Sequence, residues 1–216
     1  MITGHAITVN LTWWNSALHS RSLPGGPVVG IDASGAIVDS GRAVITRGDV
    51  FNIARGGRTP ESALRLLWHS LAWGSGGHVR NNHQRMDSVA KDPEIAADAL
   101  KAAAELSESS PADAFDALYP RGRSLLSGLG PAFFTKFLYF AGAGAVNHPC
   151  VILDNRVAAA LNQAGWTSLS TRGPWPADAY ARYCTLLSRW AGEVGPAPQR
   201  PDLIERWLFD QGGPDR

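Results

Sequence analysis

Along most of the chain, apolar residues return every three or four positions, which is the spacing of one face of an α-helix. The clearest case begins at Thr59 and Pro60, a capping residue followed by a helix-starting proline, and we expect Gly74 to end this helix. A second long helix is expected from Asp92 to about Leu106. Shorter helices are expected over residues 50–54, 155–163, 176–190 and 202–209. The pattern therefore predicts a mainly α protein.

The remaining segments have the composition of strands, turns and loops. Residues 28–31 and 36–38 are apolar and flank the turn sequence DASG, which predicts a short N-terminal β-hairpin. Residues 73–86 are polar and rich in glycine, so we expect a loop that approaches the substrate. The histidines in it, His78 and His83, fit such a loop better than a metal site. A proline-rich loop is expected over residues 195–201.

One lysine stands out because of its surroundings. Only three of the 20 Lys and Arg residues are lysines, and one of them, Lys136, lies in the aromatic run FFTKFLYF. Arginine keeps its proton in proteins, whereas a desolvated lysine can lose one and act as an amine nucleophile. Lys136 is therefore a candidate Schiff-base residue. The alternative is a lysine whose ammonium group simply reaches water.

Two motifs surround this lysine. The turn Gly128-Leu129-Gly130-Pro131 precedes the aromatic helix, and the segment from residue 112 to 126 before it predicts a helix interrupted at residues 119–122. Backbone N–H groups at such a turn point outward beside a helix N-terminus, which suits a phosphate. Asp154 follows Lys136 by 18 positions and precedes a helical run, where it is also a suitable N-cap. Capping a helix does not prevent Asp154 from also acting as a carboxylate beside Lys136.

Together these motifs, within residues 127–156, resemble the helix-hairpin-helix DNA glycosylase superfamily, and most closely a bacterial group similar to 8-oxoguanine DNA glycosylases. The resemblance rests on the GLGP turn, the run FFTKFLYFAG and the run ILDNRVAAAL. It implies one domain over residues 1–216, with two helical lobes around one cleft and a hairpin region over about residues 112–156. In the family the lysine lies two residues after the second glycine. Here that position is Ala132, and Lys136 lies one helical turn later on the same face.

The resemblance also implies a reaction and its residues. A damaged or modified base, 8-oxoguanine above all, would be flipped out of double-stranded DNA and excised by attack of Lys136 on C1′, with Asp154 stabilising the charge that develops. Cleavage of the strand by β-elimination, an AP lyase activity, would follow. The turn from Gly128 to Pro131 and Arg156 would bind the DNA backbone, with Arg121 or Arg123 assisting. The candidates for the base pocket are Phe140, Trp207 and Phe209.

Composition limits the alternatives. A net charge of +1 argues against strong non-specific attraction to nucleic acid. The two cysteines, Cys150 and Cys184, lack metal-site spacing, so we expect neither zinc nor an iron–sulfur cluster, and no other cofactor. A monovalent cation at the hairpin backbone is compatible with the resemblance. No signal peptide and no apolar run of membrane-spanning length is evident, so we expect the protein to be in the cytoplasm, associated with the nucleoid. We also expect it to be a monomer.

Two other functions remain open from the residues alone. A non-catalytic helix-hairpin-helix module would keep the GLGP turn but would need neither Lys136 nor Asp154. A glycosylase for another modified base, for instance in defence against phage DNA, would keep all three features.

Overall fold

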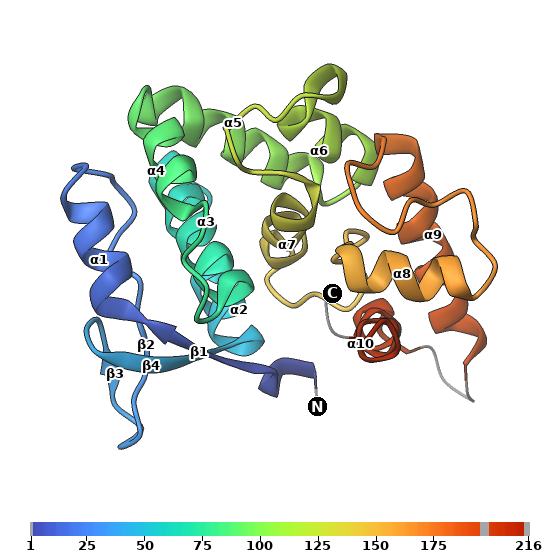
Figure 1. The fold of residues 1–216 in the computed structure, drawn as a ribbon, viewed down its shortest axis with the longest axis horizontal. Coiled ribbons are helices and arrows are strands. Elements are labelled where there is room, and N and C mark those ends of the chain that lie inside the picture. Colours follow the sequence, from blue (N-terminus) through green and yellow to red (C-terminus); the bar gives the residue numbers. More distant parts are fainter. Residues whose placement is uncertain (1, 195–198, 214–216) are drawn as a thin grey trace.

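The computed structural model describes residues 2–194 and 199–213, so four residues of the expected proline-rich loop, 195–198, lie outside it. Its described part contains ten α-helices, two 3-10 helices and one four-stranded antiparallel sheet (Figure 1). The helices are α1 (Leu11–His19), α2 (Arg47–Arg55), α3 (Pro60–Ser75), α4 (Asn82–Ala90), α5 (Pro93–Leu106), α6 (Pro111–Leu118), α7 (Pro131–Ala141), α8 (Asn155–Gln163), α9 (Ala177–Glu193) and α10 (Pro201–Gln211), with 3-10 helices η1 (Ile2–Gly4) and η2 (Pro120–Gly122). The predicted mainly α fold is confirmed.

The N-terminal region is more regular than its sequence indicates. Its strands are β1 (Ala6–Asn10), β2 (Gly30–Ile31), β3 (Ile37–Val38) and β4 (Arg42–Thr46), in the order β1-β4-β2-β3. The predicted hairpin is the β2–β3 pair, but β1, β4 and α1 were not predicted. The β1–β4 pairing joins Ala6 to Thr46 and Asn10 to Arg42. These residues are far apart in the sequence, so no turn sequence between adjacent strands predicts the pairing.

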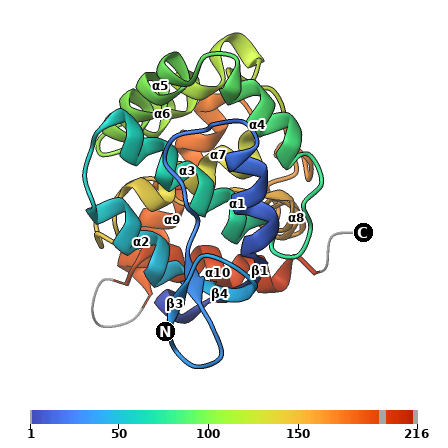
Figure 2. The same ribbon diagram turned by 90° about the vertical axis from the view of Figure 1, so that its left-hand side faces the viewer.

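The middle of the chain folds into helices α2 to α7, and most of their starts carry side-chain caps. Thr46 caps α2, Thr59 caps α3, Asp92 caps α5 and Ser110 caps α6. Two predictions need correction here. Helix α3 continues through Gly74 to Ser75, and the segment expected to be a loop, residues 73–86, includes the end of α3 and the first part of α4. Helix α7 lies between α3 and α8 in Figure 1, and the turned view in Figure 2 shows α10 between α7 and the strands.

The last residues before α8 are buried, and they place the start of that helix. Val151, Ile152 and Leu153 are at most 2% exposed. Helix α9 holds this segment, because the hydroxyl of Tyr180 donates to the Val151 carbonyl oxygen at 2.9 Å and that of Tyr183 to the Ile152 carbonyl oxygen at 2.6 Å. The residue that follows is Asp154, so its position is fixed by two buried tyrosines and not by α8 alone.

Candidate active site

The amine of Lys136 reaches back along α7 toward the N-terminus of the helix. Its Nζ atom donates to the Ala132 carbonyl oxygen at 2.7 Å and lies 3.3 Å from Oδ2 of Asp154. Side chains on a helix lean toward its N-terminus, so a long side chain covers the turn before its own Cα. The amine of Lys136 therefore lies beside position 132, one helical turn before its own Cα.

Gly74 leaves room for this side chain. A Cβ atom at position 74 would lie 2.8 Å from Cδ of Lys136 and 3.3 Å from Cε. Glycine inside a helix costs roughly 1 kcal/mol of stability relative to alanine. The glycine that was expected to end α3 instead allows α3 and α7 to approach with the lysine between them.

Asp154 uses its two carboxylate oxygens for different purposes. Oδ1 accepts from the backbone N–H groups of Arg156 and Val157, each at 3.2 Å, and so caps α8. Oδ2 faces Lys136, and both side chains are mostly buried, with 10% of Lys136 and 14% of Asp154 exposed. The N-cap role considered for Asp154 is therefore real, and it leaves one oxygen free to act on the lysine.

Lys136 and Asp154 open onto a cavity of about 390 Å³, a size typical of small-molecule sites. Its walls combine aromatic rings and charged groups from the N-terminal segment and from helices α2, α3, α7, α8 and α10. The residues that line it include His5, Arg47, Trp73, Phe133, Arg156, Glu205 and Phe209. Among these residues, only Arg156 and Phe209 were predicted site residues, because nothing local in the sequence distinguishes the others from core or surface residues.

The three candidates for the base pocket occupy different environments. Phe209 lines the cavity, where Arg156 stacks over its ring at 3.9 Å from the centroid. Phe140 is completely buried and packs against Phe51 and Trp73, so it belongs to the core and its prediction is corrected. Trp207 is 59% exposed and does not line the cavity, which removes it from the pocket as well.

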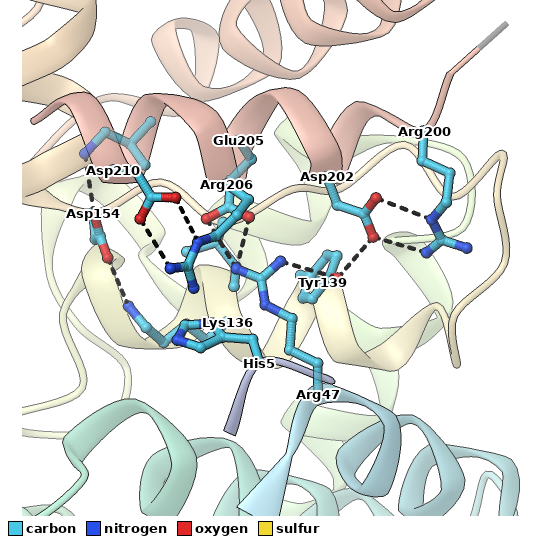
Figure 3. A network of polar contacts seen from close by, with 12 residues as sticks. His5, Arg47, Lys136, Tyr139, Asp154, Arg200, Asp202, Glu205, Arg206 and Asp210 are labelled. Carbon is cyan, nitrogen blue, oxygen red and sulfur yellow. Dashed lines mark hydrogen bonds and ion pairs between the residues drawn. The ribbon is translucent and has the colours of Figure 1, made fainter. Parts of the chain in front are cut away.

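A buried ion pair forms one wall of the cavity (Figure 3). Arg47 and Glu205, each with 1% of its side chain exposed, lie with Nη2 2.8 Å from Oε2. Burial raises the pKa of Glu205 above its usual range, and the Arg47 guanidinium opposes that shift. No described residue accepts a hydrogen bond from Nε of Arg47. This wall of the cavity is therefore almost completely buried, and it holds an N–H donor that has no acceptor among the described residues.

The same network continues away from the cavity (Figure 3). Nη1 of Arg47 donates to the Tyr139 hydroxyl at 3.3 Å, and that hydroxyl donates to Oδ2 of Asp202 at 2.8 Å. Arg200 then pairs with Asp202 at 2.7 Å. These contacts fix α10 against α2 and α7, so the cavity wall is rigidly supported from behind.

His5 adds a neutral ring to the cavity. It meets Trp73 edge-on, with 5.1 Å between ring centroids, and lies 6.3 Å from Phe209. Burial, together with the positive charges of Arg206 and Arg47, lowers the pKa of His5 to about 4. At neutral pH the imidazole is therefore uncharged and offers one donor and one acceptor.

The GLGP turn borders a neighbouring groove of about 340 Å³, which shares Ala132, Phe133 and Asn155 with the cavity. Gly128, Gly130 and Pro131 line this groove, whereas the side chain of Leu129 is 2% exposed and packs in the core. The backbone N–H of Leu129 donates to the Leu126 carbonyl oxygen at 3.0 Å, so Leu129 offers a ligand neither its side chain nor a free N–H group. Gly130 is the N-cap of α7 and has open space around it, since no atom lies within 4 Å of a Cβ built there.

The predicted basic residues do not all gather at the turn. Arg156 points into the cavity, where its Nε is buried and has no hydrogen-bond partner among the described residues. Arg121 and Arg123 are exposed on either side of Gly122 in the connection between α6 and the turn. The predicted interruption at residues 119–122 contains the short η2, with Arg121 at a positive φ of 54°, and residues 123–126 after it form no helix.

Other parts of the described chain offer less to a reaction. A second cavity of about 320 Å³ lies along α3 and α5, but its charged groups pair with each other at the surface, Arg58 with Glu108 and Lys101 with Glu105. Among the described residues, no cluster of three or more His, Cys, Asp or Glu side chains is arranged to hold a metal ion, and no helix is long and apolar enough to cross a membrane. The expectation of no cofactor stays a prediction.

Comparison with known proteins gives one result. Neither the curated proteins nor the solved structures contain a significant match to this chain. A family model does match, over residues 1–209, and its description is "Putative 8-oxoguanine DNA glycosylase OGG-like protein". The match covers both motifs and every residue that lines the cavity. The chain therefore belongs to the OGG-like family of DNA glycosylases, as its motifs indicated.

Proposed function

We propose that this DNA glycosylase excises an oxidised purine, 8-oxoguanine first of all, with Lys136 as the nucleophile and Asp154 as its partner. The observation that carries the proposal is the 3.3 Å contact between these two side chains at the mouth of a cavity that also holds aromatic rings. A base cannot be reached inside a duplex, so the nucleotide would be flipped into this cavity.

The contacts support separate roles for Lys136 and Asp154. The amine of Lys136 attacks C1′ once it has lost its proton, and the bond from C1′ to the base breaks while the new C–N bond forms. The base leaves with the electron pair of the broken bond and takes up a proton. Asp154 is the nearest carboxylate to the amine, so it can accept the amine proton and stabilise the positive charge on the sugar. The C1′–O4′ bond then breaks, O4′ takes up a proton and the C1′–N bond becomes the Schiff base. Loss of a proton from C2′ then breaks the C3′–O bond, with the 3′ phosphate as the leaving group, and this β-elimination cleaves the strand.

The cavity suits a purine with polar edges. Phe209 and Phe133 supply apolar faces, while Glu205 and Arg47 supply an acceptor and a donor on one wall. A binding module without catalysis would need none of these groups around a buried lysine. The substrate is expected to be a damaged base in double-stranded DNA, bound by a monomer through the hairpin backbone and Arg156.

The test is an excision assay on a panel of duplexes. Each duplex carries one modified base, among them 8-oxoguanine, 7,8-dihydro-8-oxoadenine, uracil and a methylated purine, and the products are resolved with and without alkaline treatment. Release of 8-oxoguanine in preference to the others supports the proposal. Release of a different base only would assign the enzyme to that base, and binding without release of any base would favour the non-catalytic module.

A further inference from the structure

A buried arginine outside both motifs contacts the DNA-binding turn. Arg85, on α4, is 4% exposed. Its Nε donates to the Gly128 carbonyl oxygen at 2.8 Å, and its Nη1 donates to Oδ1 of Asn82 at 2.5 Å. Asn82 is itself completely buried and donates to the Ser75 hydroxyl at 3.0 Å. Arg85 thus connects the turn to the end of α3.

Helix α4 holds the same turn at a second point. The backbone N–H of Ser127 donates to the Ser88 hydroxyl at 2.8 Å, and Nε2 of Gln84 donates to the Ser127 hydroxyl at 2.8 Å. Gly128 itself has a positive φ of 78°, a conformation that glycine adopts without strain. The orientation of the peptide groups at 127–128 therefore depends on α4 as well as on the glycine.

Arg85 also contacts an aromatic residue that lines the cavity. Its guanidinium lies 3.7 Å from the centroid of the Phe133 ring. Phe133 lines both the cavity and the groove at the turn, and its ring centroid lies 5.5 Å from Nζ of Lys136. One side chain thus contacts the turn through its edge and the aromatic wall beside the lysine through its face.

Among the described residues, Arg85 has no partner of opposite charge. No carboxylate of the described residues forms an ion pair with it, and its partners are a carbonyl, an amide and an aromatic ring. Burial lowers its pKa to about 10, so it is still a cation at neutral pH. Burying an unpaired charge is costly, and the groove that Arg85 lines is where an anion would lower that cost.

We propose that Arg85 is a positioning residue that fixes the turn at Gly128 and the ring of Phe133 relative to each other. Its positive charge, which no described carboxylate balances, favours a backbone phosphate in the groove. This inference rests on the proposed function for its substrate, duplex DNA. It requires the planar fork of arginine, because a lysine keeps the charge but cannot bond at two points and stack on a ring at once.

The test compares Arg85→Lys with Arg21→Lys. Arg21 is the matched control, since it also holds α4, through a 2.6 Å ion pair with Asp87, but does not contact the turn. Three quantities are measured: amide hydrogen exchange of residues 126–134 in the free protein, affinity for an undamaged duplex, and the single-turnover rate of excision at saturating DNA. Thermal unfolding of both variants reports whether either fold is weakened.

We expect Arg85→Lys to speed exchange in residues 126–134 and to weaken duplex binding, each by about tenfold or more, while Arg21→Lys changes neither. The single-turnover rate of excision in Arg85→Lys should also fall, because Phe133 lies beside the lysine. Unchanged exchange, unchanged affinity or an equal effect of Arg21→Lys would each overturn the inference. A wild-type protein that binds duplex but excises nothing would overturn the proposed function, while the exchange and affinity results would still decide the role of Arg85.

Discussion

Nζ of Lys136 lies 3.3 Å from Oδ2 of Asp154, and the other oxygen of that carboxylate caps α8. One carboxylate thus ties the helix that carries the amine to the start of the next helix. Because Tyr180 and Tyr183 hold the segment before Asp154, the distance between amine and carboxylate is set by the buried core and not by a mobile loop.

Replacing the lysine should abolish covalent trapping. We expect Lys136→Gln to form no borohydride-stable adduct with an 8-oxoguanine duplex, because an amide cannot form a Schiff base. Lys101→Gln is the control, since Lys101 lies on α5 in a surface pair with Glu105. Equal trapping by wild type and Lys136→Gln would assign the nucleophile to another amine.

The two roles of Asp154 can be separated by two substitutions. Asp154→Asn keeps an oxygen that can cap α8, so stability should change little, whereas excision should slow by about a hundredfold, equivalent to roughly 3 kcal/mol of barrier. Asp154→Ala should in addition lose about 1 kcal/mol of stability with the cap. Urea unfolding and single-turnover excision measure the two effects. Activity of Asp154→Asn near that of wild type would leave the carboxylate a capping role only.

The hairpin can be tested without disturbing the fold. Gly130 has φ −80° and ψ 173°, which any residue adopts, and a Cβ there meets no protein atom within 4 Å. We therefore expect Gly130→Val to keep its melting temperature but to weaken binding to all duplex sequences alike, because the side chain blocks the approach of a phosphate.

Gly192→Val, at an equally open position on α9, is the control for that change. Log affinity of the wild type against log salt should have a slope of about −2 to −4, because few phosphates are contacted. Full binding by Gly130→Val, or a slope near −8, would locate the interface elsewhere.

Two aromatic residues of α10 should differ in their effect on excision. Phe209 lines the cavity, whereas Trp207 is largely exposed and does not. Phe209→Ala should lower excision about tenfold or more by removing a stacking face, and Trp207→Ala should leave it within about twofold. Single-turnover rates at saturating DNA measure both. A larger loss in Trp207→Ala would mean that the base lies against the outer face of α10.

The stability of the protein should fall in mild acid, in part because of His69. Burial lowers the pKa of this imidazole from 6.5 to about 4, and its Nε2 accepts from the Val29 backbone N–H at 3.1 Å. The native state therefore binds fewer protons than the unfolded state between these values, so the contribution is complete above pH 6.5 and is lost as the pH falls toward 4. His5 acts in the same direction.

Urea unfolding at pH 7 and at pH 4.5 measures this dependence. In His69→Gln, which does not titrate, the loss of unfolding free energy between the two pH values should be smaller by about 2 kcal/mol. An unchanged loss would show that protons are taken up at other groups.

Local chemistry was sufficient for several elements of this fold. Helix α5 begins after Asp92 and ends at Leu106 as predicted, and α8 covers the predicted residues 155–163, because the caps and the apolar spacing lie within the helix and its flanks. Lys136 was identified for the same reason, since its aromatic neighbours are adjacent in the chain. The family was also recognisable from residues 127–156 alone.

Contacts between residues far apart in the chain could not be predicted from the sequence. Arg47 and Glu205 are 158 positions apart, and their ion pair exists because α10 packs beside α2. Phe140 and Phe209 are the same residue type, yet one is enclosed by Phe51 and Trp73 and the other faces the cavity. Residue types and their neighbours along the chain were enough to name the candidate reactive side chains. Tertiary packing decided which of them meet, because burial and distance depend on all the helices at once.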